Sequence, residues 1–165
     1  MSQAAPMPSH VAGQLVFLAC VADDAHSRTA ARFAALRARN TGGRFEILHV
    51  VQPPEFQHWA AVGALMRAET QAEGQTLLEA IGAEAEAFSG VKPFLKLREG
   101  PIGEEILRHV ESDSTINILV VGAAPPDARR GSLISWLAGQ LAGQLRIPLV
   151  IVPGMLSDAE LQDLT

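Results

Sequence analysis

Two kinds of segment alternate along the chain. Short apolar runs rich in β-branched residues are followed by longer stretches in which apolar residues recur every three or four positions. This alternation predicts strand–helix–strand units around a parallel sheet. The runs are almost continuously apolar, which is typical of strands that helices cover on both faces. The predicted strands are residues 15–21, 45–51, 93–97, 116–121 and 148–152.

Capping residues and helical spacing place a first helix directly after the first strand. Asp23, Asp24 and Ser27 offer side-chain oxygens to the free amides at the start of this helix. The glycine pair at positions 42–43 predicts its end, because glycine tolerates the positive φ of a helix terminus.

The segment between the second and third strands is only partly convincing as a helix. Its second half carries one apolar stripe, made of Leu77, Leu78, Ile81, Ala85 and Phe88. Gly63 and Gly74 predict that the first half is broken or mobile, because glycine weakens helices. The pattern leaves the structure and role of residues 55–72 open. A later amphipathic helix is predicted after Gly100-Pro101, and a last one is predicted to begin at Ser132.

Length and composition predict one soluble domain with a substantial core. The chain has 165 residues, of which 48% are hydrophobic, and a net charge of −5. This charge gives no electrostatic reason to expect nucleic acid or an anionic membrane as a partner. The lone Cys20 lies in an apolar run and indicates a buried thiol in a reducing compartment, hence the cytoplasm.

The two ends of the chain read as tails around this domain. Residues 1–12 lack the basic and apolar regions of a secretory signal and are expected to be a flexible N-terminal tail. The most apolar stretch, residues 11–21, is well short of the ~20 residues that cross a bilayer. The domain is expected over residues 13–154, and residues 155–165 are expected to be an acidic C-terminal tail.

Candidate chemistry gathers in the loops after the first and fourth strands. In open α/β sheets, ligands bind at the carboxyl ends of the strands where the strand order reverses. Asp23 and Asp24 follow the first strand, and Gly131-Ser132 ends the loop after the fourth, where helix amides favour a phosphate. The alternative is that Gly131-Ser132 only caps a helix while Arg129 and Arg130 are solvated. The loop lacks the lysine of a P-loop.

The spacing of residues supports neither a metal site nor the active site of a serine hydrolase. The five histidines form neither an i, i+4 pair nor a cluster with cysteine, so no metal site is expected. No Gly-x-Ser-x-Gly elbow occurs, so no serine nucleophile is expected. His49 and His109 are expected to be hydrogen-bonded histidines at the edge of the core.

Motifs in the order typical of one family cover residues 13–154. They are the run Leu15 to Ala30, Ile-Leu-His-Val-Val at 47–51, Arg-Glu-Gly-Pro-Ile-Gly-Glu-Glu-Ile-Leu at 98–107, Ile-Leu-Val-Val-Gly at 118–122, Gly-Ser-Leu at 131–133 and Ile-Pro-Leu-Val-Ile-Val-Pro at 147–153. The ordered set resembles the universal stress proteins. This resemblance implies an open five-stranded parallel sheet of strand order 3-2-1-4-5, the adenine nucleotide α-hydrolase-like fold. It also implies a role in the stress response.

One branch of that family binds ATP between the first and fourth strands, so the resemblance implies ATP or AMP as a ligand. The implied nucleotide-binding residues are Ala22, Asp23, Val50, Gly122, Arg129, Arg130, Gly131, Ser132 and Leu133. The branch has Gly, two residues, Gly, nine residues, then Gly-Ser or Gly-Thr. Here Pro125 replaces the second glycine, and only five residues separate it from Gly131. The family's nucleotide-contacting aspartate aligns with Ala22, so nucleotide binding is expected to be weak or lost.

The sequence therefore predicts a dimeric stress-response regulator that needs no cofactor and is not an enzyme. The resemblance implies dimers that pair their last strands, and an apolar edge strand is better covered by a twin than left open. The expected interface residues are Leu149, Val150, Ile151 and Val152. The alternative is a nucleotide-using enzyme of related fold, an ATP pyrophosphatase or nucleotidyl transferase, although Ala22 to Ser27 lacks the glycines of their phosphate loop. A purely structural interaction module is the third interpretation.

Overall fold

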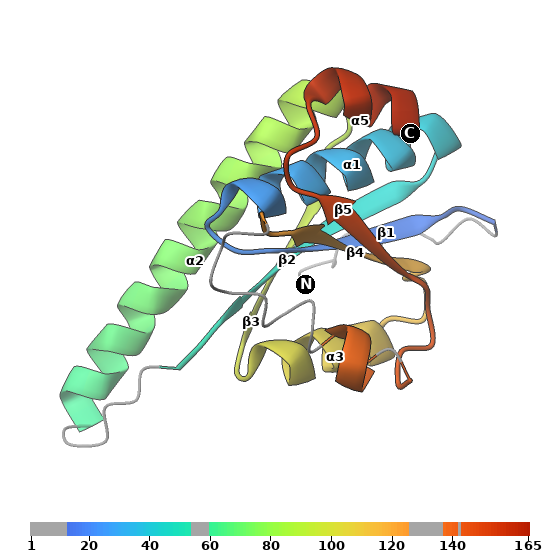
Figure 1. The fold of residues 1–165 in the computed structure, drawn as a ribbon. Helices are drawn as coiled ribbons and strands as arrows, with labels where there is room; N and C mark the ends of the chain where they lie inside the picture. Colours follow the sequence, from blue (N-terminus) through green and yellow to red (C-terminus); the bar gives the residue numbers. More distant parts are fainter. Residues whose placement is uncertain (1–12, 54–59, 126–136, 142) are drawn as a thin grey trace, which may run out of the picture.

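A computed structural model describes residues 13–53, 60–125, 137–141 and 143–165, and Figure 1 shows their arrangement. The elements are β1 (Val16–Val21), α1 (Ala25–Thr41), β2 (Arg44–Val51), α2 (Ala60–Ser89), β3 (Phe94–Glu99), α3 (Ile102–Ser112), β4 (Ile118–Ala123), the π-helix η1 (Leu137–Leu141), β5 (Leu149–Pro153) and α5 (Asp158–Leu164). The strands form one parallel sheet in the order β3-β2-β1-β4-β5. The expected fold class and strand order are confirmed.

Helices cover both faces of the sheet, and each face has its own apolar core. Successive residues of a strand point to opposite faces, so β1 contributes to both cores. Phe17, Ala19 and Val21 pack with α1, α2 and α5, which lie together on one side in Figure 1. Val16 and Leu18 pack on the other side with residues of α3 and η1. All six residues of β1 are buried, which explains why the strand reads as one continuous apolar run.

Helix α1 is held close to the sheet because its inner face is built from alanine. Five alanines, at positions 30, 31, 34, 35 and 38, are buried there. The expected start and end of the helix are confirmed. The Asp24 carboxylate accepts a hydrogen bond from the backbone N–H of Ser27 at 2.7 Å, and Gly42 ends the helix with φ 68°.

Helix α2 is one continuous helix of 30 residues, so the expected break in its first half is wrong. Gly74 does not interrupt the helix but allows it to approach the sheet. A Cβ atom at this position would lie 2.7 Å from Cγ1 of Val51 and 3.0 Å from Cδ1 of Leu97. Tertiary packing therefore overrides the low helix propensity of glycine. The part of the expected open segment that precedes residue 60 lies outside the described residues.

The expected C-terminal tail is also wrong, because residues 158–164 form helix α5. A capping box begins this helix: Ser157 and Glu160 exchange side-chain and backbone hydrogen bonds. Leu161 is fully buried against the α1 side of the core, and Arg32 forms an ion pair with Asp158 at 3.3 Å. The buried Leu161 and the capping box thus stabilise a helix in a segment whose acidic composition alone predicts a solvated tail.

Two polar contacts of the α3 side stabilise long-range packing. Nε2 of His109 lies 3.2 Å from the carboxylate of Glu46, and both side chains are buried, as expected for a hydrogen-bonded core histidine. The guanidinium of Arg146 donates to three backbone carbonyls, those of residues 110, 113 and 116, at 2.6, 2.6 and 3.1 Å. Arg146 thereby satisfies carbonyls at the end of α3 and joins them to the segment that leads into β4.

Candidate functional site

The strands β1 and β4 separate at their carboxyl ends. Their ladder has three pairs and stops at Ala19↔Val120, although β1 continues to Val21 and β4 to Ala123. On the two sides of this gap, β1 stays paired with β2 as far as Val21↔His49, and β4 stays paired with β5 as far as Ala123↔Pro153. The chain order also reverses here, since β2 and β3 follow on one side and β5 on the other. The carboxyl ends of β1 and β4, called the crevice below, are therefore the topological switch point of the sheet, the position where ligands of open α/β sheets bind.

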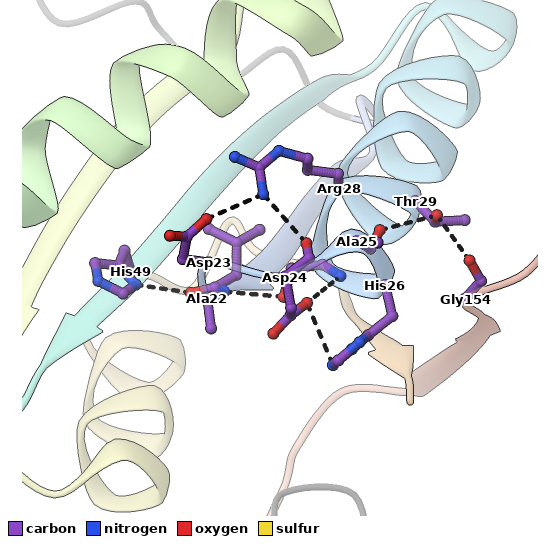
Figure 2. Close-up of polar contacts among 11 residues, drawn as sticks. Ala22, Asp23, Asp24, Ala25, His26, Arg28, Thr29, His49 and Gly154 are labelled. Atoms are coloured by element: carbon purple, nitrogen blue, oxygen red, sulfur yellow. Dashed lines mark hydrogen bonds and ion pairs between the residues drawn. The ribbon is translucent and has the colours of Figure 1, made fainter. Parts of the chain in front are cut away.

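A hydrogen-bonded turn connects β1 to α1 at the edge of the crevice (Figure 2). The backbone N–H of Ala22 donates to Oγ of Ser27 at 2.9 Å, while Asp24 caps the helix. The backbone N–H of Asp24 also donates to the Ala22 carbonyl at 2.9 Å. Ser27 thus forms hydrogen bonds both with Ala22, the residue after β1, and with the capping Asp24. These two bonds fix the position of the turn relative to β1. Ala22, the first candidate residue, is exposed at this turn.

The described charges near β1 are unfavourable to an anion. Asp23 is 79% exposed, and its carboxylate lies 3.3 Å from the guanidinium of Arg28. That guanidinium also lies 3.2 Å from the carboxylate of Glu84 on α2. Arg28 therefore already faces two carboxylates, and Asp24 occupies one of the helix amides, that of Ser27, and places its own negative charge at the helix start. The β1 side of the crevice is therefore a less favourable phosphate site than an uncapped helix N-terminus.

Gly122 and Gly154 lack side chains because the first turn of α1 packs directly on them. A Cβ atom on Gly122 would lie 2.1 Å from the carbonyl oxygen of His26, and one on Gly154 would lie 2.4 Å from Cβ of His26. The Thr29 hydroxyl lies 3.1 Å from the Gly154 carbonyl and ties α1 to the end of β5. Packing between β4 and α1 is thus a sufficient reason for glycine at position 122.

Apolar residues and one histidine lie beside the crevice. The candidate Val50 is buried on β2 in the α3-side core, together with Cys20 and Val121. Burial raises the pKa of the Cys20 thiol to about 12, which makes it unreactive at neutral pH. His49 donates from Nδ1 to the Val21 carbonyl at 2.8 Å, as expected for a hydrogen-bonded histidine.

The phosphate side of the candidate site lies mostly outside the described residues. Gly122 lies in β4, and Pro125 is exposed two residues after the strand. The remaining candidates, Arg129, Arg130, Gly131, Ser132 and Leu133, lie outside the described residues, as does the expected helix start at Ser132. Of the predicted nucleotide-binding residues, the structure therefore brings together those at the ends of β1, β2 and β4.

The candidate dimer residues form the edge strand β5. Among the described strands, β5 pairs with β4 alone. Val152 is buried in the α1-side core, and Leu149 and Val150 are half-buried. Ile151 is 42% exposed. Ile151 is thus the member of the set whose side chain is most available to a partner.

Sequence reasoning missed the contacts that His26 and Arg28 make. His26 lies between Gly122 and Gly154, with Nε2 3.2 Å from the Asp24 carboxylate. Asp23 and Asp24 are close in sequence to these two residues, but the contacts with Glu84, Gly122 and Gly154 join distant segments, so no local pattern signals them. A glycine at a strand end is the one available signal, and it equally fits a ligand site.

Neither a metal site nor a membrane span emerges from the described part of the chain. No three His, Cys, Asp or Glu side chains there are grouped so that they could hold a metal ion. No helix among those residues is long and apolar enough to span a bilayer.

Comparisons with known proteins agree with this architecture. The sequence model of the universal stress protein family matches residues 16–153. No curated protein sequence matches the chain significantly. The structure is similar to that of universal stress protein UspA from Lactobacillus plantarum, with 15% identity, a TM-score of 0.69, and coverage of 86% of this chain and 99% of that one.

Two further structures of the fold contain a nucleotide. A universal stress protein family protein from Arabidopsis thaliana with AMP bound gives a TM-score of 0.60 at 16% identity, covering 84% of this chain and 91% of that one. The universal stress protein from Archaeoglobus fulgidus in complex with dAMP gives a TM-score of 0.54 at 15% identity, covering 84% of this chain and 97% of that one. These identities support the shared fold, while the family model covers most of the sequence. The chain belongs to the universal stress protein family.

Proposed function

We propose that this protein is a dimeric, cytoplasmic stress-response regulator that binds adenine nucleotides weakly and does not act as an enzyme. The observation that carries the proposal is the separation of β1 and β4 beyond Ala19↔Val120. It provides a crevice at the position where this fold binds ligands. The AMP and dAMP found in the two similar structures support an adenine nucleotide as the ligand.

Weak binding follows from the groups around the crevice. Ala22 stands where the family has a nucleotide-contacting aspartate, and Pro125 has no N–H to donate to a phosphate. One lost charge-assisted hydrogen bond costs roughly 1.5–3 kcal/mol, a tenfold to hundredfold loss of affinity. Asp23 and Asp24 add repulsion, which is about 1 kcal/mol for two unit charges 4 Å apart in water.

Calorimetric titration of the nucleotide-stripped protein with ATP, ADP and AMP tests the proposal. We expect dissociation constants weaker than ~10 μM, which corresponds to about 7 kcal/mol. Ala22→Asp would restore the missing carboxylate, and we expect it to tighten binding by about tenfold. Ala25→Asp adds the same charge one turn away and is the matched control, expected to leave the affinity unchanged or weaker. Wild-type binding well below 10 μM would overturn the weak-binding proposal, and the absence of any saturable heat from both wild type and Ala22→Asp would overturn nucleotide binding.

Dimerisation through β5 is the second part of the proposal. The outward side of Ile151 and the unpaired edge of β5 would both be covered by the β5 strand of a second copy. We expect light scattering at micromolar concentration to give twice the 17.5 kDa of one chain. Ile151→Lys should give monomers, whereas Leu164→Lys, at an exposed position on α5, should not. A wild-type protein that is monomeric at this concentration would refute the dimer.

The crevice also lacks an evident nucleophile among the described residues, which supports regulation rather than catalysis. The Cys20 thiol is protonated at neutral pH because its pKa is raised. The two histidines near the crevice are engaged, His49 with a carbonyl and His26 with the carboxylate that caps α1. We therefore expect ATP to remain intact during long incubation with the protein, as measured by chromatography of the nucleotides.

A further inference from the structure

A shallow hollow lies between the start of α1 and the middle of α2, and it borders the turn after β1 at Asp23. Its volume is about 490 Å³, and its floor is formed by Ala72, Thr76, Leu77 and Ala80 of α2. The hollow is wide open to solvent, so it can receive side chains of a docked partner but does not enclose a small molecule. Three of the four floor residues are apolar, so the hollow suits an apolar group. In Figure 1, the N-terminal part of α2 extends beyond α1, and the rest of α2 runs beside α1.

Carboxylates outnumber cations around this hollow. Asp23 and Glu73 line it together with Arg28. As Figure 2 shows, Arg28 faces Asp23, and its guanidinium also forms an ion pair with Glu84. The net charge of Asp23, Glu73, Glu84 and Arg28 is therefore negative. Arg28, the one cation among these four, already forms two ion pairs. An occupant with positive charge would be attracted to this rim.

The part of α2 before the hollow carries exposed apolar side chains. Val62 is 49% exposed and Leu65 is 62% exposed. Helical spacing places both on the face of α2 that also carries Glu69, Glu73 and Thr76. This face thus carries two exposed apolar side chains, Val62 and Leu65, followed toward the hollow by two carboxylates, Glu69 and Glu73. At 1.5 Å per residue, the path from Leu65 to Ala80 is about 22 Å long.

We propose that this face of α1 and α2 binds a cationic amphipathic helix of a partner protein. Leucine-type side chains of the partner would fill the hollow and cover Leu65, while its lysines or arginines would meet Asp23, Glu69 and Glu73. A helix of about 15 residues spans the path. The charge disfavours other occupants: a second copy docked through the same face would bring the same carboxylates, and nucleic acids or anionic membranes would be repelled. The proposal does not depend on nucleotide binding.

The test uses a defined probe, a fluorescein-labelled peptide of 15 residues built from leucine and lysine with leucines at helical spacing. Its counterpart has glutamate in place of every lysine. Fluorescence anisotropy with the full chain at about 0.15 M salt, where exposed charges beyond ~8 Å are screened, measures both affinities. We expect saturable binding of the lysine peptide and at least tenfold weaker binding of the glutamate peptide. Lysine-peptide binding that does not saturate below 100 μM, or equal binding of both peptides, would overturn the proposal.

Two sets of variants distinguish this face from a general charge effect. The triple variant Asp23→Asn, Glu69→Gln, Glu73→Gln should weaken binding of the lysine peptide at least tenfold. The control triple variant Glu79→Gln, Glu86→Gln, Asp163→Asn removes the same charge from exposed positions off this face and should change the affinity less than threefold. Equal losses in the two triples would overturn the proposal.

Filling the hollow gives an independent test that leaves the charges intact. Ala80 is exposed, so Ala80→Trp should fold normally, which thermal unfolding by circular dichroism verifies. The indole would occupy the space intended for the partner's apolar side chain, and we expect at least tenfold weaker binding of the lysine peptide. Unchanged affinity in a folded Ala80→Trp protein would show that the hollow is not used.

Discussion

Substituting Gly122 tests whether α1 is packed on β4 as tightly as the structure indicates. In Gly122→Ala the new Cβ would lie 2.1 Å from the His26 carbonyl oxygen, 2.5 Å from its carbonyl carbon and 3.2 Å from the Ser27 nitrogen. Ordinary contacts between heavy atoms are about 3.5–4.0 Å, so the methyl group comes more than one ångström too close to backbone atoms. These atoms cannot rotate away, because the Asp24 cap and the contact between Thr29 and Gly154 hold the turn.

Overpacking of this kind costs about 1–3 kcal/mol, and backbone neighbours place Gly122→Ala near the upper end of that range. For a domain of this size a loss of 3 kcal/mol lowers the melting temperature by about 6–12 °C. Urea unfolding at a fixed protein concentration measures the change, because the stability of a dimer depends on concentration. Gly143→Ala is the matched control, since no described atom lies within 4 Å of its new Cβ.

A Gly122→Ala protein within about 0.5 kcal/mol of wild type would refute the packing argument. If nucleotide affinity fell in such a stable variant, the glycine would instead serve the approach of a ligand. A large loss of stability with the control unaffected would confirm that α1 requires glycine at the end of β4.

Three further predictions concern Arg146, Cys20 and Glu105. Arg146→Ala should lower the free energy of unfolding by about 2 kcal/mol, because three carbonyls lose a charged donor. The control is Arg39→Ala, which removes only an exposed contact with the adjacent residue. In chemical unfolding, this control should leave the free energy of unfolding almost unchanged. Because the pKa of Cys20 is raised to about 12 from 9.0, the folded protein binds more protons above pH 9, so stability should fall as pH rises from about 9 to 12. Wild type should lose roughly 1 kcal/mol more than Cys20→Ala between pH 9 and 10 in urea unfolding. The Arg98 hydrogen bond holds the pKa of Glu105 below its ordinary value, so this carboxylate contributes stability above that ordinary value and loses it as pH falls through the folded pKa. Acid unfolding of Glu105→Gln should therefore depend less on pH than that of wild type, and identical profiles would contradict the role of this pair.

The features that local patterns predicted correctly are those with short-range causes. The alternation of strands and helices follows from periodicity, and the Asp24 cap and the Gly42 terminus follow from conformational preferences of single residues. Strand order came from the resemblance to a family rather than from periodicity, because a pattern of apolar residues does not state which strands are neighbours. The structure confirms that order.

The errors also have a common cause. Gly74 was interpreted as a helix breaker, yet it faces Val51 and Leu97 in a helix that packing stabilises. The segment after β5 was interpreted as a tail, yet Leu161 is buried against the α1-side core. In both cases a few contacts with distant residues outweigh a local preference of about 1 kcal/mol or less.

In the candidate site, too, local sequence predicts some features, and contacts between distant segments determine the others. From the amino-acid sequence alone, one can place an acidic turn after the first strand, a glycine at the end of the fourth, and an apolar fifth strand. Only the tertiary structure decides that Arg28 is shared by Asp23 and Glu84, that the start of α1 fills the space beside Gly122, and that β1 and β4 part beyond Ala19. The reason is physical: local preferences act between residues within a few positions of one another, whereas charge pairing and close packing depend on which distant segments folding brings together.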